Sequence, residues 1–177
     1  MSAPAKRRTP NLGVIILGVD ASLRSTGYAI IESRGNSFRA ITFGRIHNPQ
    51  KILPSRCLVR IADAICDLIR QHKPDAVAVE GLTFVQNQQI ALKLGQARGA
   101  AILAAASAGL PIYEYAPRKV KQAIVGIGSA QKIQVGTMVK SLLGLCEIPQ
   151  EDAADALAIA LCHAQNHRSV IEKSKEI

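Results

Sequence analysis

The chain has 177 residues, of which 48% are hydrophobic, 20% charged and only 3% aromatic. This apolar content excludes a disordered chain, and the length predicts one globular domain that folds without a metal or disulfide staple. No apolar run reaches the ~18 residues of a membrane span, and the first ten residues carry charge without an apolar stretch behind it. We therefore expect no membrane association, no secretory leader and a cytoplasmic location.

The charge is unevenly distributed: 22 Lys and Arg against 13 Asp and Glu give a net charge of +9. We predict a disordered basic arm over residues 1–13, one domain over 14–166 and a mobile tail over 167–177. The domain holds 16 basic and 11 acidic residues, and a basic surface favours a polyanionic partner such as nucleic acid. An ordinary basic soluble protein explains the charge equally well. The four cysteines lack the spacing of a zinc site, so we expect reduced thiols.

Three strands are expected at the beginning of the domain. Residues 14–20 form a continuous apolar run that ends abruptly at Asp20, which is typical of a strand buried on both faces. Residues 27–31 and 38–46 follow as two further strands, with a hairpin turn signal at Gly35-Asn36 between them. Such short connections predict an antiparallel meander.

Helices and strands alternate in the remainder of the domain. Apolar residues recur at three- and four-residue spacing after Pro54, which predicts a helix as far as Lys73. Two more strands are expected over residues 76–80 and 111–115, separated by an alanine-rich helix. The alanine-rich helix is expected over residues 86–108, and further helices are expected over 117–125, 129–144 and 150–166. The pattern predicts one α/β domain with a mixed five-stranded sheet flanked by helices.

Four carboxylates stand out in this arrangement. Asp20 and Glu80 each end a buried strand, and ligand sites of open α/β sheets lie outside the carboxyl ends of the strands. Asp152 and Asp155 are three residues apart, so they share one face of a helix. Each acid alone also has a structural explanation, because acids are favoured in the first turns of a helix and Asp20 could brace the next turn. Together they predict one acidic site.

Four converging acids repel one another unless cations hold them together. Carboxylate oxygens without His or Cys suit Mg²⁺ or Mn²⁺, and two such ions about 4 Å apart would clamp an in-line phosphoryl displacement. With a basic domain around the acids, the simplest reaction class is hydrolysis of a phosphodiester by metal-activated water.

Several blocks of the sequence resemble the RuvC family of Holliday junction resolvases. They occur in the family's order and at compatible spacing over residues 15–20, 25–28, 77–80, 91–99, 120–130 and 152–160. The resemblance implies an RNase H-like fold, with three antiparallel strands followed by two parallel ones, and a homodimer. It also implies Mg²⁺-dependent symmetric nicking of two strands of a four-way DNA junction, leaving 5′-phosphate and 3′-hydroxyl ends. The branch-migration proteins RuvA and RuvB are the implied partners.

The resemblance carries the metal-ligand and catalytic roles onto Asp20, Glu80, Asp152 and Asp155, which would hold two Mg²⁺ ions, with Mn²⁺ as a substitute. A four-way junction has two equivalent strands to cut, so a twofold dimer with two equivalent sites is physically reasonable.

The predicted DNA contacts are basic residues in or near these blocks. Lys121 and Lys132 occupy positions where the family carries basic residues implicated in DNA binding, and we assign them to phosphate contact near the scissile group. Arg98 lies in the block at residues 91–99 and is a further candidate, although a solvated helix charge would explain it too.

Two more candidates, Arg118 and Lys119, precede a glycine pair. We expect Gly126 and Gly128 to open a helix that continues through Lys132, so that backbone N–H groups come close to a phosphate. An ordinary turn between two helices would leave the same pattern.

The chain departs from the family pattern at two places. Ala21-Ser22 stands where the family usually has Pro-Gly after the first acid, which puts the turn geometry in doubt. The family tends to place an aromatic wedge three residues beyond the second acid, where this chain has Thr83 followed by Phe84. Phe84 could open junction base pairs after a one-residue shift, or it could be a core or dimer-interface aromatic.

Three other functions compete with the resolvase reading. A non-catalytic junction-binding protein is disfavoured by the retention of all four acids, because an unused acidic cluster is unfavourable beside DNA. An RNase H-like nuclease with another DNA or RNA substrate stays open. An actin-like or sugar-kinase phosphate site would need a second lobe, for which 177 residues leave no room.

Overall fold

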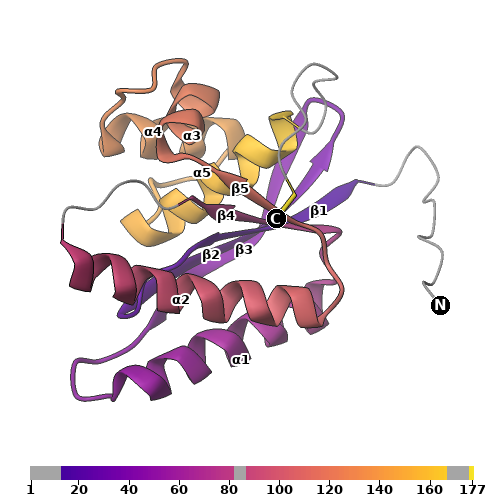
Figure 1. Ribbon diagram of the computed structural model, residues 1–177. Coiled ribbons are helices and arrows are strands. Elements are labelled where there is room, and N and C mark those ends of the chain that lie inside the picture. Colours follow the sequence, from indigo (N-terminus) through magenta and orange to yellow (C-terminus); the bar gives the residue numbers. More distant parts are fainter. Residues whose placement is uncertain (1–12, 82–86, 167–175) are drawn as a thin grey trace.

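The computed structural model describes residues 13–81, 87–166 and 176–177. A five-stranded mixed sheet with the strand order β3-β2-β1-β4-β5 forms its centre (Figure 1). The strands are β1 (Val14–Asp20), β2 (Ser25–Arg34), β3 (Ser37–His47), β4 (Ala76–Glu80) and β5 (Ile112–Tyr115). The first three strands pair antiparallel, and β4 and β5 continue the sheet in parallel with β1. The predicted meander and the predicted mixed sheet are therefore confirmed.

The two strands that end in an acid are neighbours inside the sheet. Val19 pairs with Val79 in the parallel register of β1 and β4, so Asp20 and Glu80 leave the sheet side by side at its carboxyl edge. Alternate residues of both strands enter the two opposite cores; Ile16 and Ala78 face one core, whereas Leu17 faces the other. This burial on both faces explains the continuous apolar runs.

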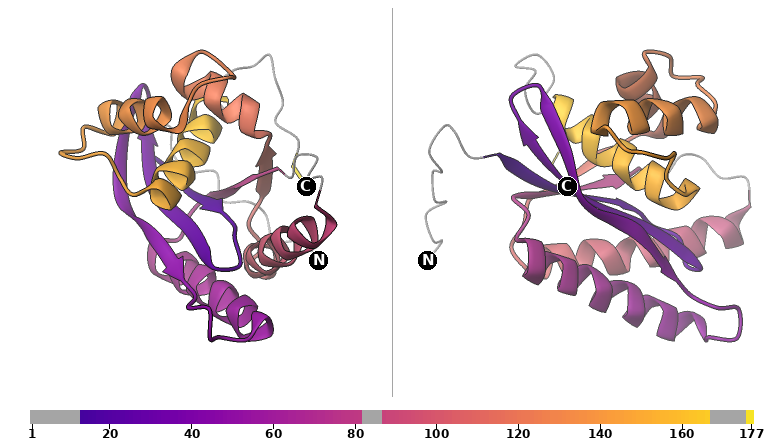
Figure 2. Two further views of the ribbon diagram at one scale, coloured as in Figure 1. Left: turned by 90° about the vertical axis from the view of Figure 1, so that its left-hand side faces the viewer. Right: turned by 180° about the vertical axis from the view of Figure 1, so that it is seen from behind.

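Helices cover both faces of the sheet (Figures 1 and 2). One face carries α1 (Pro54–His72) and α2 (Gln88–Ser107). The opposite face carries α3 (Pro117–Val125), α4 (Lys132–Leu143) and α5 (Glu151–Asn166). In the part of the chain that the structure describes, none of these helices combines the length and apolar character needed to cross a membrane.

Helix α5 packs unusually close to the sheet because two strands present glycine beneath it. A Cβ atom on Gly18 would lie 2.2 Å from the carbonyl oxygen of Ala156, and one on Gly27 would lie 1.9 Å from that of Asp152. Real Cβ atoms essentially never approach another heavy atom within 3.0 Å. The backbone of α5 therefore lies against the backbone of the sheet at both points, and the first turns of α5 lie above the carboxyl end of β1 and the beginning of β2.

The end of the chain returns to the edge of the sheet. Glu176 forms an antiparallel bridge with Tyr113, and the Ile177 N–H donates to the carbonyl oxygen of Ile112 at 3.0 Å. The predicted basic arm and most of the predicted tail lie outside the described residues. The last two residues are ordered against β5.

The four cysteines are free thiols, with Cys57 and Cys162 buried.

Candidate active site

Asp20 and Glu80 form the half of the site that the sheet contributes. The pKa of Asp20 is raised to about 7, first by burial and then by the neighbouring charges of Glu80, Asp155 and Asp152, in that order of effect. Burial also raises the pKa of Glu80, followed by the charge of Asp155. The structure thus brings the four predicted acids into one electrostatic cluster.

The other half of the site comes from the first turns of α5. Asp152 accepts a hydrogen bond from the hydroxyl of Ser25, the first residue of β2. Burial raises the pKa of Asp155, and Lys132 opposes that rise through its charge and a hydrogen bond of 3.4 Å between Nζ and Oδ2. Because Gly18 and Gly27 let α5 approach, these two acids reach the same edge of the sheet as Asp20 and Glu80.

The two predicted lysines lie beside the acids. The positive charge of Lys132 lowers the pKa values of Asp20, Glu80 and Asp155, and that of Lys121 lowers the pKa of Glu80. Lys132 also donates a hydrogen bond to Glu151, which raises the lysine pKa and keeps it protonated. Glu151 and Ser25 were not among the predicted site residues, although Ser25 begins one of the blocks that resemble RuvC.

The chemistry of the donor set fits hard divalent cations. All four donors are carboxylates, and burial together with neighbouring negative charge makes the ionised forms of Asp20, Glu80 and Asp155 costly without added positive charge. Among the described residues, no three His, Cys, Asp or Glu side chains are already gathered into a ligand group. Asp152 accepts a hydrogen bond from Ser25, and Asp155 accepts one from Lys132. The acids fit Mg²⁺ or Mn²⁺ by composition and charge.

The expected helix start at residues 126–129 was wrong. Gly126 ends α3 with a φ of 86°, and its N–H donates to the carbonyl oxygen of Gln122 at 2.9 Å. Gly128 makes room for a side chain, because a Cβ there would lie 2.6 Å from Cγ of Arg118. Helix α4 begins only at Lys132. The two glycines therefore end one helix and shape a turn, and the expected cradle of helix N–H groups is not formed there.

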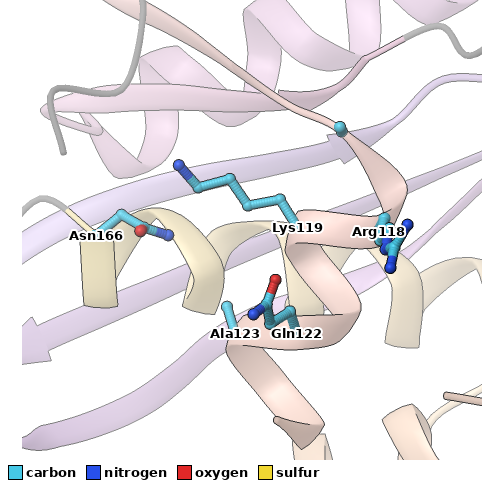
Figure 3. A pocket seen from close by; sticks show the side chains of 6 residues that line it. Arg118, Lys119, Gln122, Ala123 and Asn166 are labelled. Carbon is cyan, nitrogen blue, oxygen red and sulfur yellow. The ribbon is translucent and has the colours of Figure 1, made fainter. Parts of the chain in front are cut away.

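Arg118 and Lys119 line a separate pocket of about 450 Å³ between the start of α3 and the end of α5 (Figure 3). Gln122 and Asn166 add two amide groups to its wall. The charge of Lys119 acts on Cys162 of α5, whereas Lys121 of the same helix acts on Glu80. Of the basic side chains of α3, Lys121 thus acts on the acids, whereas Arg118 and Lys119 line this pocket.

Comparison with known proteins decides the family. The family model described as "Crossover junction endodeoxyribonuclease RuvC" matches residues 16–163. The chain belongs to the RuvC family. A protein of that description from Geobacter metallireducens is 52% identical over 151 residues, which cover 85% of this chain and 92% of the relative. The relative from Caldicellulosiruptor saccharolyticus is 44% identical over 164 residues, which cover 92% and 99% of the two chains.

A solved structure supports the same assignment at the level of the fold. The chain of "T. thermophilus RuvC in complex with Holliday junction substrate" has a TM-score of 0.87 and 34% sequence identity, over 93% of this chain and 99% of that one. The RNase H-like α/β fold is thereby confirmed, including the order of three antiparallel and two parallel strands.

The departure from the RuvC pattern at Ala21-Ser22 is accommodated by the turn. Ser22 donates its N–H to Oγ1 of Thr26 at 3.2 Å, and the Thr26 hydroxyl donates back to the Ser22 carbonyl oxygen at 2.6 Å. Within residues 13–81, 87–166 and 176–177, only Lys73 has a positive φ without being glycine. Ser22 therefore needs no glycine-like conformation.

Arg98 and the aromatic wedge are the remaining RuvC-like candidates. The Arg98 side chain is only 17% exposed, and it is bound by Glu114 and by the backbone carbonyl of Glu80. The structure thus turns it inward, which removes the basis for assigning it to a DNA phosphate. Thr83 and Phe84 lie outside the described residues.

Proposed function

We propose that this RuvC-family protein resolves four-way (Holliday) DNA junctions by metal-dependent hydrolysis of one phosphodiester bond in each of two strands. It acts as a cytoplasmic homodimer and leaves 5′-phosphate and 3′-hydroxyl ends. The observation that carries the proposal is the meeting of Asp20, Glu80, Asp152 and Asp155 beside Lys121 and Lys132. The similarity of nearly the whole chain to RuvC proteins supports the same reaction.

The four acids would hold two Mg²⁺ ions, with Mn²⁺ as a substitute. Bound there, the ions would activate a water molecule as the nucleophile and neutralise charge on the reacting phosphate. Three side chains near the acids have separate roles in this reaction. Ser25 orients the carboxylate of Asp152, and Lys132 offers positive charge to a phosphate beside Asp155. Lys121 adds positive charge beside Glu80.

The remaining cations would hold the arms of the junction. Arg118 and Lys119, which line a pocket with Asn166, would contact a phosphate that is not cut. A second protomer would supply the second cutting site, because symmetric nicking requires two equivalent centres. RuvA and RuvB are the expected branch-migration partners.

A cleavage assay tests the reaction. The purified protein is incubated with Mg²⁺ and a synthetic four-way junction, and in parallel with linear duplex of the same sequence and with an RNA–DNA hybrid. We expect paired symmetric nicks in the junction only, and their loss in Asp20→Asn. Tight junction binding without cleavage in Mg²⁺ or Mn²⁺ would favour the binding module instead. Preferential cutting of the duplex or the hybrid would favour an RNase H-like nuclease with another substrate.

The dimer and the DNA contacts have tests of their own. Light scattering during size-exclusion chromatography should give about twice the 18.9 kDa of one chain, and a mass of one chain at micromolar concentration would contradict the dimer. Lys119→Gln should weaken binding to junctions of different sequence by a similar factor. The slope of log affinity against log salt concentration should become shallower by about one, which corresponds to the loss of one phosphate contact. An unchanged slope would remove Lys119 from the interface.

A further inference from the structure

The carboxyl end of β4 is held from outside the acid cluster by an ion pair. Arg98 of α2 donates from Nε to the backbone carbonyl oxygen of Glu80 at 3.1 Å. Another nitrogen of the same guanidinium pairs with the carboxylate of Glu114 in β5. The side chains of Arg98 and Glu114 are 17% and 37% exposed, so the pair is shielded much better than an ordinary surface ion pair.

Glu114 also reaches the residue after Glu80. A Cβ atom on Gly81 would lie 2.7 Å from Oε1 of Glu114, and the Gly81 N–H donates to the carbonyl oxygen of Tyr115 at 2.8 Å. The residue after β4 therefore lies against the Glu114 carboxylate, and there is no space for a side chain at position 81. Glu80 is fixed through its own carbonyl on one side and through Gly81 on the other.

We propose that Arg98 and Glu114 are positioning residues, which fix the backbone of Glu80 and keep the Arg98 guanidinium away from the Glu80 carboxylate. The inference rests on the proposed function, because it assigns a purpose to the geometry of a metal ligand. Arginine suits this task because its rigid planar fork directs separate N–H groups to the carbonyl and to the carboxylate in a fixed geometry, whereas the ammonium of lysine is a point charge on a flexible stem.

The two residues have unequal roles, and this makes the proposal specific. Loss of Arg98 frees the Glu80 carbonyl but leaves the Glu80 carboxylate available to a metal ion. Loss of the Glu114 charge leaves a shielded guanidinium without its anion, next to a residue that carries another carboxylate. Arg98 then turns to Glu80 and withdraws it from the acid cluster. Removing both charges restores the availability of Glu80.

The test compares Glu114→Gln, Arg98→Met, Arg98→Lys and the double variant Arg98→Met/Glu114→Gln. Mn²⁺ affinity is measured without DNA by titration calorimetry, and kcat and KM for the junction are measured separately. Thermal unfolding of each variant is measured as well, so that a loss of Mn²⁺ binding caused by unfolding is recognised. Arg70→Met is the matched control, because Arg70 pairs with Asp67 on the exposed surface of α1, with the two side chains 78% and 64% exposed.

We expect Glu114→Gln to weaken Mn²⁺ binding by about tenfold and to lower kcat with little change in KM. Arg98→Met and Arg98→Lys should show smaller losses, the double variant should bind Mn²⁺ better than Glu114→Gln alone, and Arg70→Met should match the parent protein. Wild-type Mn²⁺ affinity in Glu114→Gln overturns the proposal, as does a double variant weaker than both single variants. A rise in KM alone would assign Arg98 to DNA instead. Failure of the proposed function would show differently, as a parent protein that cuts no junction.

Discussion

Asp20 shows at the scale of one residue how the site depends on added positive charge. Its carboxylate sits at the end of a buried strand and next to three further acids, which together with burial brings its pKa to about 7. In the metal-free protein at neutral pH, the carboxyl group is therefore often protonated. A bound cation would reverse this state, because opposite charge at short range favours the ionised form.

The first prediction concerns stability against pH. The pKa of Asp20 is about 7 in the folded protein and 3.8 in the unfolded chain, so ionisation disfavours the folded state. This cost is absent below pH 3.8, grows between the two values and is complete above pH 7. Without metal, Asp20→Asn should therefore raise the free energy of unfolding at pH 8 by up to about 4 kcal/mol, and change it little at pH 4.

Chemical denaturation at the two pH values, in the presence of a chelator, measures this difference. Saturating Mg²⁺ at pH 8 should stabilise the parent protein more than Asp20→Asn. The difference in the free energy of unfolding between the two proteins should therefore become smaller. The same stabilisation at pH 4 and pH 8 would show that a non-electrostatic change at this position is responsible.

The second prediction concerns Lys132. Its positive charge lowers the pKa values of three of the acids, so Lys132→Met should raise them and make proton release more difficult. Mn²⁺ binding without DNA should then require a pH about one unit higher for its midpoint. Lys140→Met, which removes a lysine from the last turn of the same helix, is the control and should leave the midpoint unchanged. An unshifted midpoint in Lys132→Met would contradict the assigned role.

At the scale of elements, the site depends on how closely α5 lies on the sheet. Asp152 and Asp155 belong to the helix, whereas Asp20 and Glu80 belong to strands, and only the packing between these layers brings them together. Gly18 and Gly27 allow that packing because neither carries a side chain.

The third prediction follows from this packing. Gly18→Ala or Gly27→Ala places a methyl group against the α5 backbone and should destabilise the fold by about 1–3 kcal/mol. It should also lower Mn²⁺ affinity by moving the two pairs of acids apart. Gly136→Ala is the control, since its Cβ would approach only a methyl carbon of the exposed Ile148, at 3.0 Å. Denaturation and Mn²⁺ titration of the three variants check the prediction, which fails if Gly18→Ala behaves like Gly136→Ala.

The elements themselves were largely predictable, because buried strands and amphipathic helices leave simple apolar patterns. The start of α4 was not. Glycine serves equally well at the end of one helix and before the next, and here Gly126 adopts the left-handed conformation that ends α3. The actual start at Lys132 is marked by a hydrogen bond of 2.8 Å from the Gln131 N–H to the Gln134 side chain, a less distinctive signal than a Ser or Asp cap.

The candidate site was predictable to the same limited extent. The four acids could be found because strand ends and helical spacing determine where they lie. The partners Ser25 and Glu114 could not, because their roles depend on the direction of side chains across elements. Ser25 lies 127 residues from Asp152, and Arg98, predicted as a DNA contact with a solvated helix charge as the alternative, is bound to Glu114 instead.

At the scale of the whole molecule, the net charge understates the attraction for DNA, because it includes the acids of the site. The domain over residues 14–166 has a formal net charge of +5 when all four acids of the site are counted as ionised. Two divalent ions would offset them and bring the domain to +9. The protein would then present a basic surface around a neutralised centre.

The fourth prediction tests this electrostatic account. Ca²⁺, a divalent cation of the same hard type, should raise junction affinity severalfold over a chelator at constant ionic strength. Asp20→Asn/Glu80→Gln, which lacks two of the negative charges, should bind the junction more tightly than the parent protein in the chelator and respond less to Ca²⁺. Fluorescence anisotropy with a labelled junction measures both effects. An affinity that is unchanged or higher after chelation would contradict the account.

The short pairing of Glu176 and Ile177 with β5 has a consequence for how the molecules behave in concentrated solution. An uncovered edge strand can accept a strand from another molecule and so start aggregation. The Ile177 N–H instead occupies the carbonyl of Ile112 within the same chain. At the opposite edge, β3 carries Arg39 and Arg45, whose charges discourage the same kind of association. Clipping of the last two residues would therefore affect solubility before it affected the acids.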